Sequence, residues 1–243
     1  MENVTLCRIM VFTQDSALPS CALAIMAKAP RSGAVKTRLV PPLTHDQAAA
    51  LGACFLRDTL DTVRQATRET HAHGFLLYAP TDAADEMAAF APHEFTALPQ
   101  RGATLGARLT NAVADIYALG YDSLCLLGAD SPTLPAAFLV TAVGHLQRPG
   151  ERIVIGPADD GGYYLIGLKT PCYELFEEIA WSSENVLTQT LAQAATQNLA
   201  VELLPAWYDV DDAASLRRLV LEVATQPLIA PHTRLCLPDL QTI

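Results

Sequence analysis

Short apolar runs alternate along the chain with longer stretches in which apolar residues recur at helical spacing. The runs have strand length and end at turn-forming residues, so they predict strands over residues 21–27, 75–79, 124–127, 153–155, 163–168 and 201–204. Helices are expected over about 44–63, 81–90 and 108–119, and after residues 135, 183 and 211. Strands that alternate with helices are typical of a mostly parallel sheet with helices on both faces, which is an α/β fold.

Two local signals support these elements. Thr44 and Gln47 have the spacing of a capping box, in which each side chain accepts a hydrogen bond from a backbone N–H at the start of a helix. The run 124–127 is apolar throughout, as expected for a strand that is covered on both faces. We find no internal repeat and no break in composition, so residues 21–243 are predicted to form a single domain. Residues 1–20 precede it as an N-terminal extension, either as an edge strand or as a mobile segment.

Composition excludes several classes of protein. With 243 residues, of which 51% are hydrophobic, the chain is long enough to bury a full core. Its net charge of −10 argues against general nucleic-acid binding, which needs a basic face. No apolar run approaches the ~18 residues of a membrane span, so no membrane partner is expected. The six cysteines contain no C-x-x-C pair, which favours reduced thiols and a cytoplasmic protein.

Four cations gather in the loop that follows the first predicted strand: Lys28, Arg31, Lys36 and Arg38. In an open α/β sheet, ligands bind beyond the carboxyl ends of the strands. Lysine and arginine there suit a phosphorylated ligand, because they neutralise its charge and donate hydrogen bonds to it. The alternative is an ordinary solvated loop.

Acidic residues follow at two places that could face this loop. Asp130 comes directly after a predicted strand and precedes Ser131, which we include among the substrate-binding candidates. Asp211 belongs to the acidic segment 209–212 before the last predicted helix. Magnesium is held by one or two carboxylates together with phosphate oxygens, so Asp130 and Asp211 are metal-ligand candidates. Each acid could instead cap a helix.

Residues 159–164 read Asp-Asp-Gly-Gly-Tyr-Tyr between two predicted strands. The segment is either a simple turn or part of the site, since glycines such as Gly161 and Gly162 let the backbone approach a ligand closely. Tyr163 or Tyr164 could pack on a sugar or a base. Asp160 is the candidate general base toward an acceptor hydroxyl.

Taken together, the motifs resemble a known family. They lie at residues 28–39, 100–108, 128–132, 156–168, 181–183 and 209–211. In this order they resemble the bacterial GT-A-fold transferases labelled arsenosugar-biosynthesis glycosyltransferases. They are more distantly similar to the guanylyltransferases of molybdopterin and phospholactate. The resemblance covers about residues 21–220.

The resemblance implies a GT-A-like (nucleotide-diphospho-sugar transferase) fold and a set of site residues. Lys36 and Arg38 would lie at the nucleotide phosphates, and Lys28 belongs to the same loop. Asp130 would bind Mg²⁺ or Mn²⁺, with Asp211 as second ligand. Residues expected toward the nucleoside are Gln100, Leu105, Gly106 and Arg108; Trp181 is either core or a pocket wall. The chain departs from the Asp-x-Asp motif of GT-A glycosyltransferases, because only one acid stands at 130–132.

These observations predict a nucleotide- and metal-dependent transferase with Asp160 and Lys36 as catalytic residues. The favoured reaction is glycosyl transfer from a nucleotide sugar to a small-molecule acceptor. Two alternatives stay open: a nucleotidyltransferase that releases pyrophosphate from a nucleoside triphosphate, and a nucleotide-binding protein without catalysis. Assembly as a homodimer also stays open.

Overall fold

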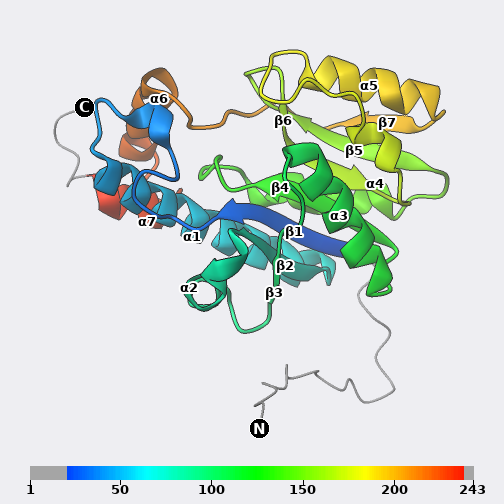
Figure 1. The fold of residues 1–243 in the computed structure, drawn as a ribbon, viewed down its shortest axis with the longest axis horizontal. Helices are drawn as coiled ribbons and strands as arrows, with labels where there is room; N and C mark the ends of the chain where they lie inside the picture. The colour runs from blue at the N-terminus through cyan, green and yellow to red at the C-terminus, as the bar shows by residue number, and fades with distance from the viewer. Residues whose placement is uncertain (1–20, 238–243) are drawn as a thin grey trace, which may run out of the picture.

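Seven strands form one sheet in a computed structural model of the chain, which describes residues 21–237 (Figure 1). The strand order is β3-β2-β1-β4-β6-β5-β7. The strands are β1 (Cys21–Lys28), β2 (His73–Ala79), β3 (Thr96–Pro99), β4 (Ser123–Gly128), β5 (Arg152–Pro157), β6 (Tyr163–Leu168) and β7 (Ala200–Leu203). Only β6 runs antiparallel to its neighbours among these strands. The mostly parallel α/β fold predicted from the sequence is confirmed. The predicted N-terminal extension lies outside the described residues.

The helices follow the predicted order with two differences. They are α1 (His45–Thr70), α2 (Ala84–Ala88), α3 (Leu105–Ala118), α4 (Ala136–Leu146), α5 (Val186–Thr196), α6 (Ala213–Thr225) and α7 (Pro231–Cys236). The helix expected over 81–90 is a 3-10 turn (Thr81–Ala83) followed by the short α2. Helix α7 was not predicted. None of the helices among residues 21–237 is long and apolar enough to cross a membrane.

Helices cover both faces of the sheet, and strand alternation assigns the core residues to each face. On one face, Leu23 and Ile25 of β1 pack with apolar residues of α1 and α4. On the other face, Ala22 and Ala24 pack with α3 and α5. The capping box of α1 forms as predicted, with Thr44 accepting a hydrogen bond from the Gln47 backbone N–H.

The direction in which the sheet grows reverses between β1 and β4. From β1 the chain continues to β2 and β3 on one side, and it then returns to β4 on the other side of β1. Both strands are parallel, so the loops after Lys28 and Gly128 leave the same edge of the sheet. Ligands of open α/β sheets bind at such a reversal, which makes this edge the place to look for a site.

A third apolar cluster lies at one end of the molecule, where α6 and α7 pack on α1. Figure 1 shows α6 and α7 beside α1, after a segment that crosses over from β7. Phe55 of α1 and Leu216 and Leu219 of α6 are fully buried in this cluster. Helix α7 also depends on a polar contact, because buried Asp58 of α1 accepts hydrogen bonds from the backbone N–H groups of His232 and Thr233 at 2.9 and 2.8 Å.

Replacing Asp58 by Ala should lower the free energy of unfolding by about 2–3 kcal/mol, because two N–H groups at the start of α7 lose a charged acceptor. Urea denaturation followed by circular dichroism measures this change. Glu69→Ala is the matched control, since it removes an exposed carboxylate from the same helix and should change the stability by less than about 0.5 kcal/mol. Equal effects of the two substitutions would contradict the role assigned to Asp58.

Candidate functional site

A cleft of about 660 Å³ opens at the sheet edge where β1 and β4 end. It lies between the basic loop 28–38, the loop after β4, the start of α3 and the segment before α6. Twelve of the fifteen site residues predicted from the sequence line it: Lys28, Lys36, Arg38, Gln100, Leu105, Arg108, Asp130, Asp160, Gly162, Tyr163, Trp181 and Asp211. Gly106, Ser131 and Gly161 are not among its lining residues. The structure therefore gathers at one place residues that are far apart in the sequence.

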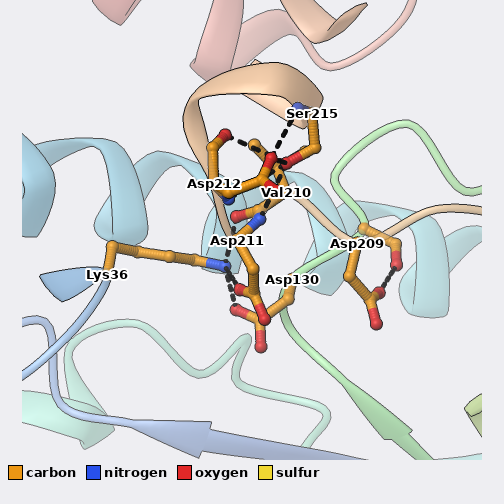
Figure 2. Close-up of polar contacts among 8 residues, drawn as sticks. Lys36, Asp130, Asp209, Val210, Asp211, Asp212 and Ser215 are labelled. Carbon is orange, nitrogen blue, oxygen red and sulfur yellow. Dashed lines mark hydrogen bonds and ion pairs between the residues drawn. The ribbon is translucent and has the colours of Figure 1, made fainter. Parts of the chain in front are cut away.

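The ammonium group of Lys36 contacts both predicted metal ligands (Figure 2). Its Nζ atom is 2.5 Å from Asp130 Oδ1 and 2.9 Å from Asp211 Oδ1. It also donates to the Val210 carbonyl oxygen at 2.8 Å. The Lys36 side chain is 6% exposed, whereas those of Asp130 and Asp211 are 49% and 45% exposed. Asp130 and Asp211 thus meet as expected, but a lysine ammonium joins them.

The acidic segment before α6 is held against the end of β4 by the backbone. The Val210 N–H donates to the Asp130 carbonyl oxygen at 2.9 Å. Asp212 is the residue that caps α6, because its carboxylate accepts hydrogen bonds from Ala214 and Ser215. Asp211 is therefore not used as the cap, and its carboxylate lines the cleft.

Asp209 is a cleft residue that the sequence analysis did not select. Its carboxylate accepts a hydrogen bond from the hydroxyl of buried Ser131, and Figure 2 shows it lying apart from the Lys36 group. Ser131, predicted to bind substrate, instead holds this neighbouring acid. The acidic segment 209–212 could have pointed to Asp209, but the spacing does not show that Asp209 and Asp211 have different partners.

Burial raises the pKa of Asp209 to about 6, and the nearby charges of Asp130 and Asp211 act in the same direction. The hydrogen bond from Ser131 favours the ionised carboxylate and opposes this shift. Asp209 is therefore a carboxyl group at the wall of the cleft that changes its charge near pH 6.

The cations of the basic loop have different surroundings. Arg31 forms ion pairs with Asp82 and Glu86 beside α2, at 3.1 and 2.9 Å. Lys28 and Arg38 line the cleft, are exposed, and form no ion pair with any residue of the part that the structure describes. Arg108 lines the cleft and donates from Nε to the Gly102 carbonyl oxygen. Positive charge is therefore open to the cleft at Lys28 and Arg38.

The residues predicted to lie toward the nucleoside also shape the cleft wall. Gln100 donates from Nε2 to the carbonyl oxygens of Ala27 and Leu77, which ties it to the ends of β1 and β2. A Cβ atom on Gly106 would lie 2.7 Å from Nε1 of Trp181, so a glycine is needed for this indole to pack against α3. Trp181 is half-buried: it packs against the core residues on one face of the sheet and also lines the cleft.

The segment 159–164 forms a tight turn at the cleft. Asp160 is exposed, and its Oδ1 atom accepts a hydrogen bond from the Gly162 backbone N–H at 2.9 Å. Gly161 has a φ of 89°, and a Cβ atom there would lie 2.3 Å from the Glu184 carbonyl oxygen. The glycine at 161 thus serves close packing against the chain before α5.

Tyr163 and Tyr164 both line the cleft, so packing of either ring on a sugar or base stays a prediction. Tyr163 and Tyr164 are successive strand residues and belong to the clusters on opposite faces of the sheet. Tyr164 is buried and donates its hydroxyl to the Pro205 carbonyl oxygen at 3.0 Å. Burial raises the pKa of the Tyr163 hydroxyl above its ordinary value, and Tyr163 lines the cleft.

The oxygen atoms around Lys36 suit a hard divalent cation. Two carboxylates and one carbonyl group converge on a single point, and oxygen donors of this kind are the ligands of Mg²⁺ and Mn²⁺. Residues 21–237 contain no group of three or more His, Cys, Asp or Glu side chains that could hold a metal ion. A cation at Asp130 and Asp211 would therefore need further ligands from phosphate or water.

The stability of the protein should depend on pH through Asp209. The pKa in the folded state, about 6, lies above the ordinary value of 3.8, so the unfolded chain ionises first and the free energy of unfolding falls between about pH 4 and pH 6. Asp209→Asn should remove about 2–3 kcal/mol of this fall, measured by urea denaturation at pH 4 and pH 7 in the presence of EDTA. Asp159→Asn, an exposed acid near the cleft, is the control. The same pH dependence in the parent and in the Asp209 variant would refute this account.

Comparisons with known proteins agree with this fold. The profile of DUF2064, described as an uncharacterised protein conserved in bacteria, matches residues 62–183. A protein from Desulfovibrio desulfuricans G20, provisionally named a nucleotide-diphospho-sugar transferase, is 32% identical with a TM-score of 0.78. The match covers 86% of this chain and 90% of that one. A search of curated proteins found no match.

Two less similar solved structures share the fold. The CMP:2-keto-3-deoxy-manno-octonic acid synthetase complexed with CTP is 10% identical with a TM-score of 0.53, over 85% of this chain and 99% of that one. Rv0371c from Mycobacterium tuberculosis H37Rv, in complex with manganese, is 19% identical with a TM-score of 0.53, over 84% and 100%. At these identities the likeness shows the fold alone.

The label arsenosugar biosynthesis is carried by neither the family profile nor these structures, so that part of the resemblance stays a prediction. The extent of the profile match, together with the similarity of the Desulfovibrio protein over most of both chains, shows the family. The chain belongs to the DUF2064 family, and it has the fold of nucleotide-diphospho-sugar transferases.

Proposed function

We propose that the protein is a metal-dependent glycosyltransferase that takes a nucleotide sugar as donor and a small molecule as acceptor. One observation carries this proposal: exposed Lys28 and Arg38 and the carboxylates of Asp130 and Asp211 line one cleft at the reversal point of the sheet. Exposed cations suit the diphosphate of a donor, and carboxylates suit the cation that would accompany it. The name of the Desulfovibrio protein supports the same class of donor.

The proposed mechanism rests on charge. A divalent cation held by Asp130 and Asp211 would neutralise the negative charge that develops on the leaving nucleoside diphosphate. Arg38 and Lys28 would bind the same phosphates from the loop after β1 and stabilise the product side of the reaction. Arg108 lines the cleft at the start of α3, next to the wall formed by Gln100 and Trp181, where we place the nucleoside.

Asp160 is the proposed general base. It lies at the cleft on an exposed turn, and its Oδ1 atom is occupied by the Gly162 N–H, which orients the carboxylate. The Oδ2 atom can then take the proton from an acceptor hydroxyl as that oxygen attacks the sugar. The tight turn, with Gly161 packed against the chain at Glu184, keeps this group in place.

Glycosyl transfer is favoured over nucleotidyl transfer by the loop after β1. That loop contains only Gly33 among residues 28–39, whereas a loop that wraps around a triphosphate with its backbone needs several glycines. The two reactions break different bonds. Glycosyl transfer leaves both phosphates on the nucleoside, and nucleotidyl transfer expels pyrophosphate.

The reaction is tested by incubating the protein and Mn²⁺ with panels of nucleotide sugars and nucleoside triphosphates, together with acceptor extracts. We expect a nucleoside diphosphate to be released from one nucleotide sugar, and Asp160→Asn to lower the rate at least a hundredfold with little change in donor affinity. Release of pyrophosphate from a triphosphate, without turnover of any nucleotide sugar, would replace this proposal by nucleotidyl transfer. Ligand binding without any turnover would favour a non-catalytic nucleotide-binding protein.

Arg38→Ala should weaken the binding of a nucleoside diphosphate by about ten- to a hundredfold, the loss expected for one charge-assisted hydrogen bond. The affinity for the bare nucleoside should stay nearly unchanged, because Arg38 is assigned to the phosphates. Isothermal titration calorimetry with both ligands measures the difference. Arg68→Ala, which removes an exposed cation that does not line the cleft, is the control. Equal losses for the two ligands would indicate that Arg38 has a structural role.

A further inference from the structure

The ammonium group of Lys36 has no hydrogen-bond donor to spare. It carries three N–H donors, and it has three acceptors within 2.9 Å: the Val210 carbonyl oxygen and one carboxylate oxygen each of Asp130 and Asp211. A phosphate could bind Lys36 only by replacing one of them. In this respect Lys36 differs from Lys28 and Arg38, whose exposed side chains have no ion-pair partner among residues 21–237.

The stem of Lys36 is also enclosed. Helix α1 places Gly52 beside it, where a Cβ atom would lie 3.8 Å from Lys36 Cγ, and the Phe55 ring centre is 5.2 Å from Nζ. Lys36 itself has a φ of 50°, in the left-handed region that most residues avoid, so the surrounding contacts hold the backbone there. Burial lowers the pKa of Lys36, but Asp130 and Asp211 outweigh it and hold the pKa above its ordinary value. The group is a fixed, buried positive charge.

This charge occupies the point at which a divalent cation would be bound. The oxygen atoms of Asp130, Asp211 and Val210 surround Nζ at 2.5–2.9 Å, which is the hard-oxygen environment described above for Mg²⁺ or Mn²⁺. A metal ion cannot share that point with the ammonium group. If the metal ion binds the other oxygen atoms of Asp130 and Asp211, it lies only a few ångströms from the positively charged ammonium group of Lys36.

We propose that Lys36 is the resident cation of the Asp130–Asp211 pair and competes with a divalent cation for these carboxylates. The inference rests on the metal-binding part of the proposed function and assigns to Lys36, in the nucleotide-free protein, a role other than phosphate binding. In the absence of nucleotide, Lys36 offsets one of the two negative charges of the pair and holds both carboxylates in place, and metal affinity is low. A bound phosphate offers the ammonium group new acceptors, which frees the carboxylates for the metal.

The test measures the binding of Mn²⁺ alone, by electron paramagnetic resonance and calorimetry, to the parent protein and to Lys36→Met. We expect Lys36→Met to bind Mn²⁺ at least tenfold more tightly. Even in a medium as polar as water, a unit charge and a divalent ion about 4 Å apart repel each other by more than the free energy of a tenfold change in affinity.

Lys28→Met is the matched control, because it removes the same charge from the same loop but from a side chain without an ion pair in the described part of the chain. Its Mn²⁺ affinity should change by less than about twofold, since an exposed charge is screened by water and salt. Circular dichroism checks that each variant folds. If Lys36→Met does not fold, Lys36→Gln removes the charge while keeping an amide donor, and the same gain in affinity is expected.

Weaker or unchanged Mn²⁺ binding by a folded Lys36 variant would overturn the inference, because Lys36 would then support the metal site or have no influence on it. An equal gain in Lys28→Met would also overturn it, since the effect would come from net charge. Binding of a nucleoside diphosphate to the parent in EDTA is measured alongside. If it persists while neither the parent nor the variants bind Mn²⁺, the inference and the metal part of the function fail, and nucleotide binding stands.

Discussion

The contacts of one buried lysine hold the cleft together. Lys36 follows β1, Asp130 follows β4, and Val210 and Asp211 precede α6, so three distant parts of the chain meet at a single Nζ atom. A charge that is removed from water is costly unless it is paired and hydrogen-bonded, and here no donor is left unsatisfied. Loss of any one contact would leave a charge or a carbonyl group without its partner. The positions of the three segments therefore depend on each other.

The elements of the fold were predictable wherever the sequence carries its own periodic signal. Strands β1 and β4 are largely apolar runs, and the start of α1 is marked by a capping box that the structure reproduces. Helix α7 was not predictable, because it has only six residues and its start depends on a distant residue. Asp58, which lies 174 positions before His232, accepts a hydrogen bond from the His232 backbone N–H. Its stability comes from a tertiary contact, and no local pattern encodes such a contact.

For the candidate site, the residue types and their meeting place were predictable, but the partners of individual side chains were not. Three aspartates stand within four positions before α6, and each has a different role. Asp209 accepts a hydrogen bond from Ser131, Asp211 pairs with Lys36, and Asp212 caps the helix. From sequence spacing, each of the three aspartates could cap the helix or bind a ligand. Their actual roles depend on which residues the fold brings next to them. For this reason Asp209 was overlooked, and Ser131 was predicted to bind substrate rather than to hold Asp209.

The same contacts decide how the cleft presents its charge. The chain carries a net charge of −10, but charges separated by more than about 8 Å are largely screened at physiological ionic strength, so a phosphate responds to the groups beside it. Lys36 is neutralised by the acids that it holds, and Arg31 by Asp82 and Glu86. Of the four cations in the loop after β1, Lys28 and Arg38 therefore offer uncompensated positive charge. A basic loop in the sequence becomes, in the folded protein, two exposed cations beside an acid pair that is already occupied.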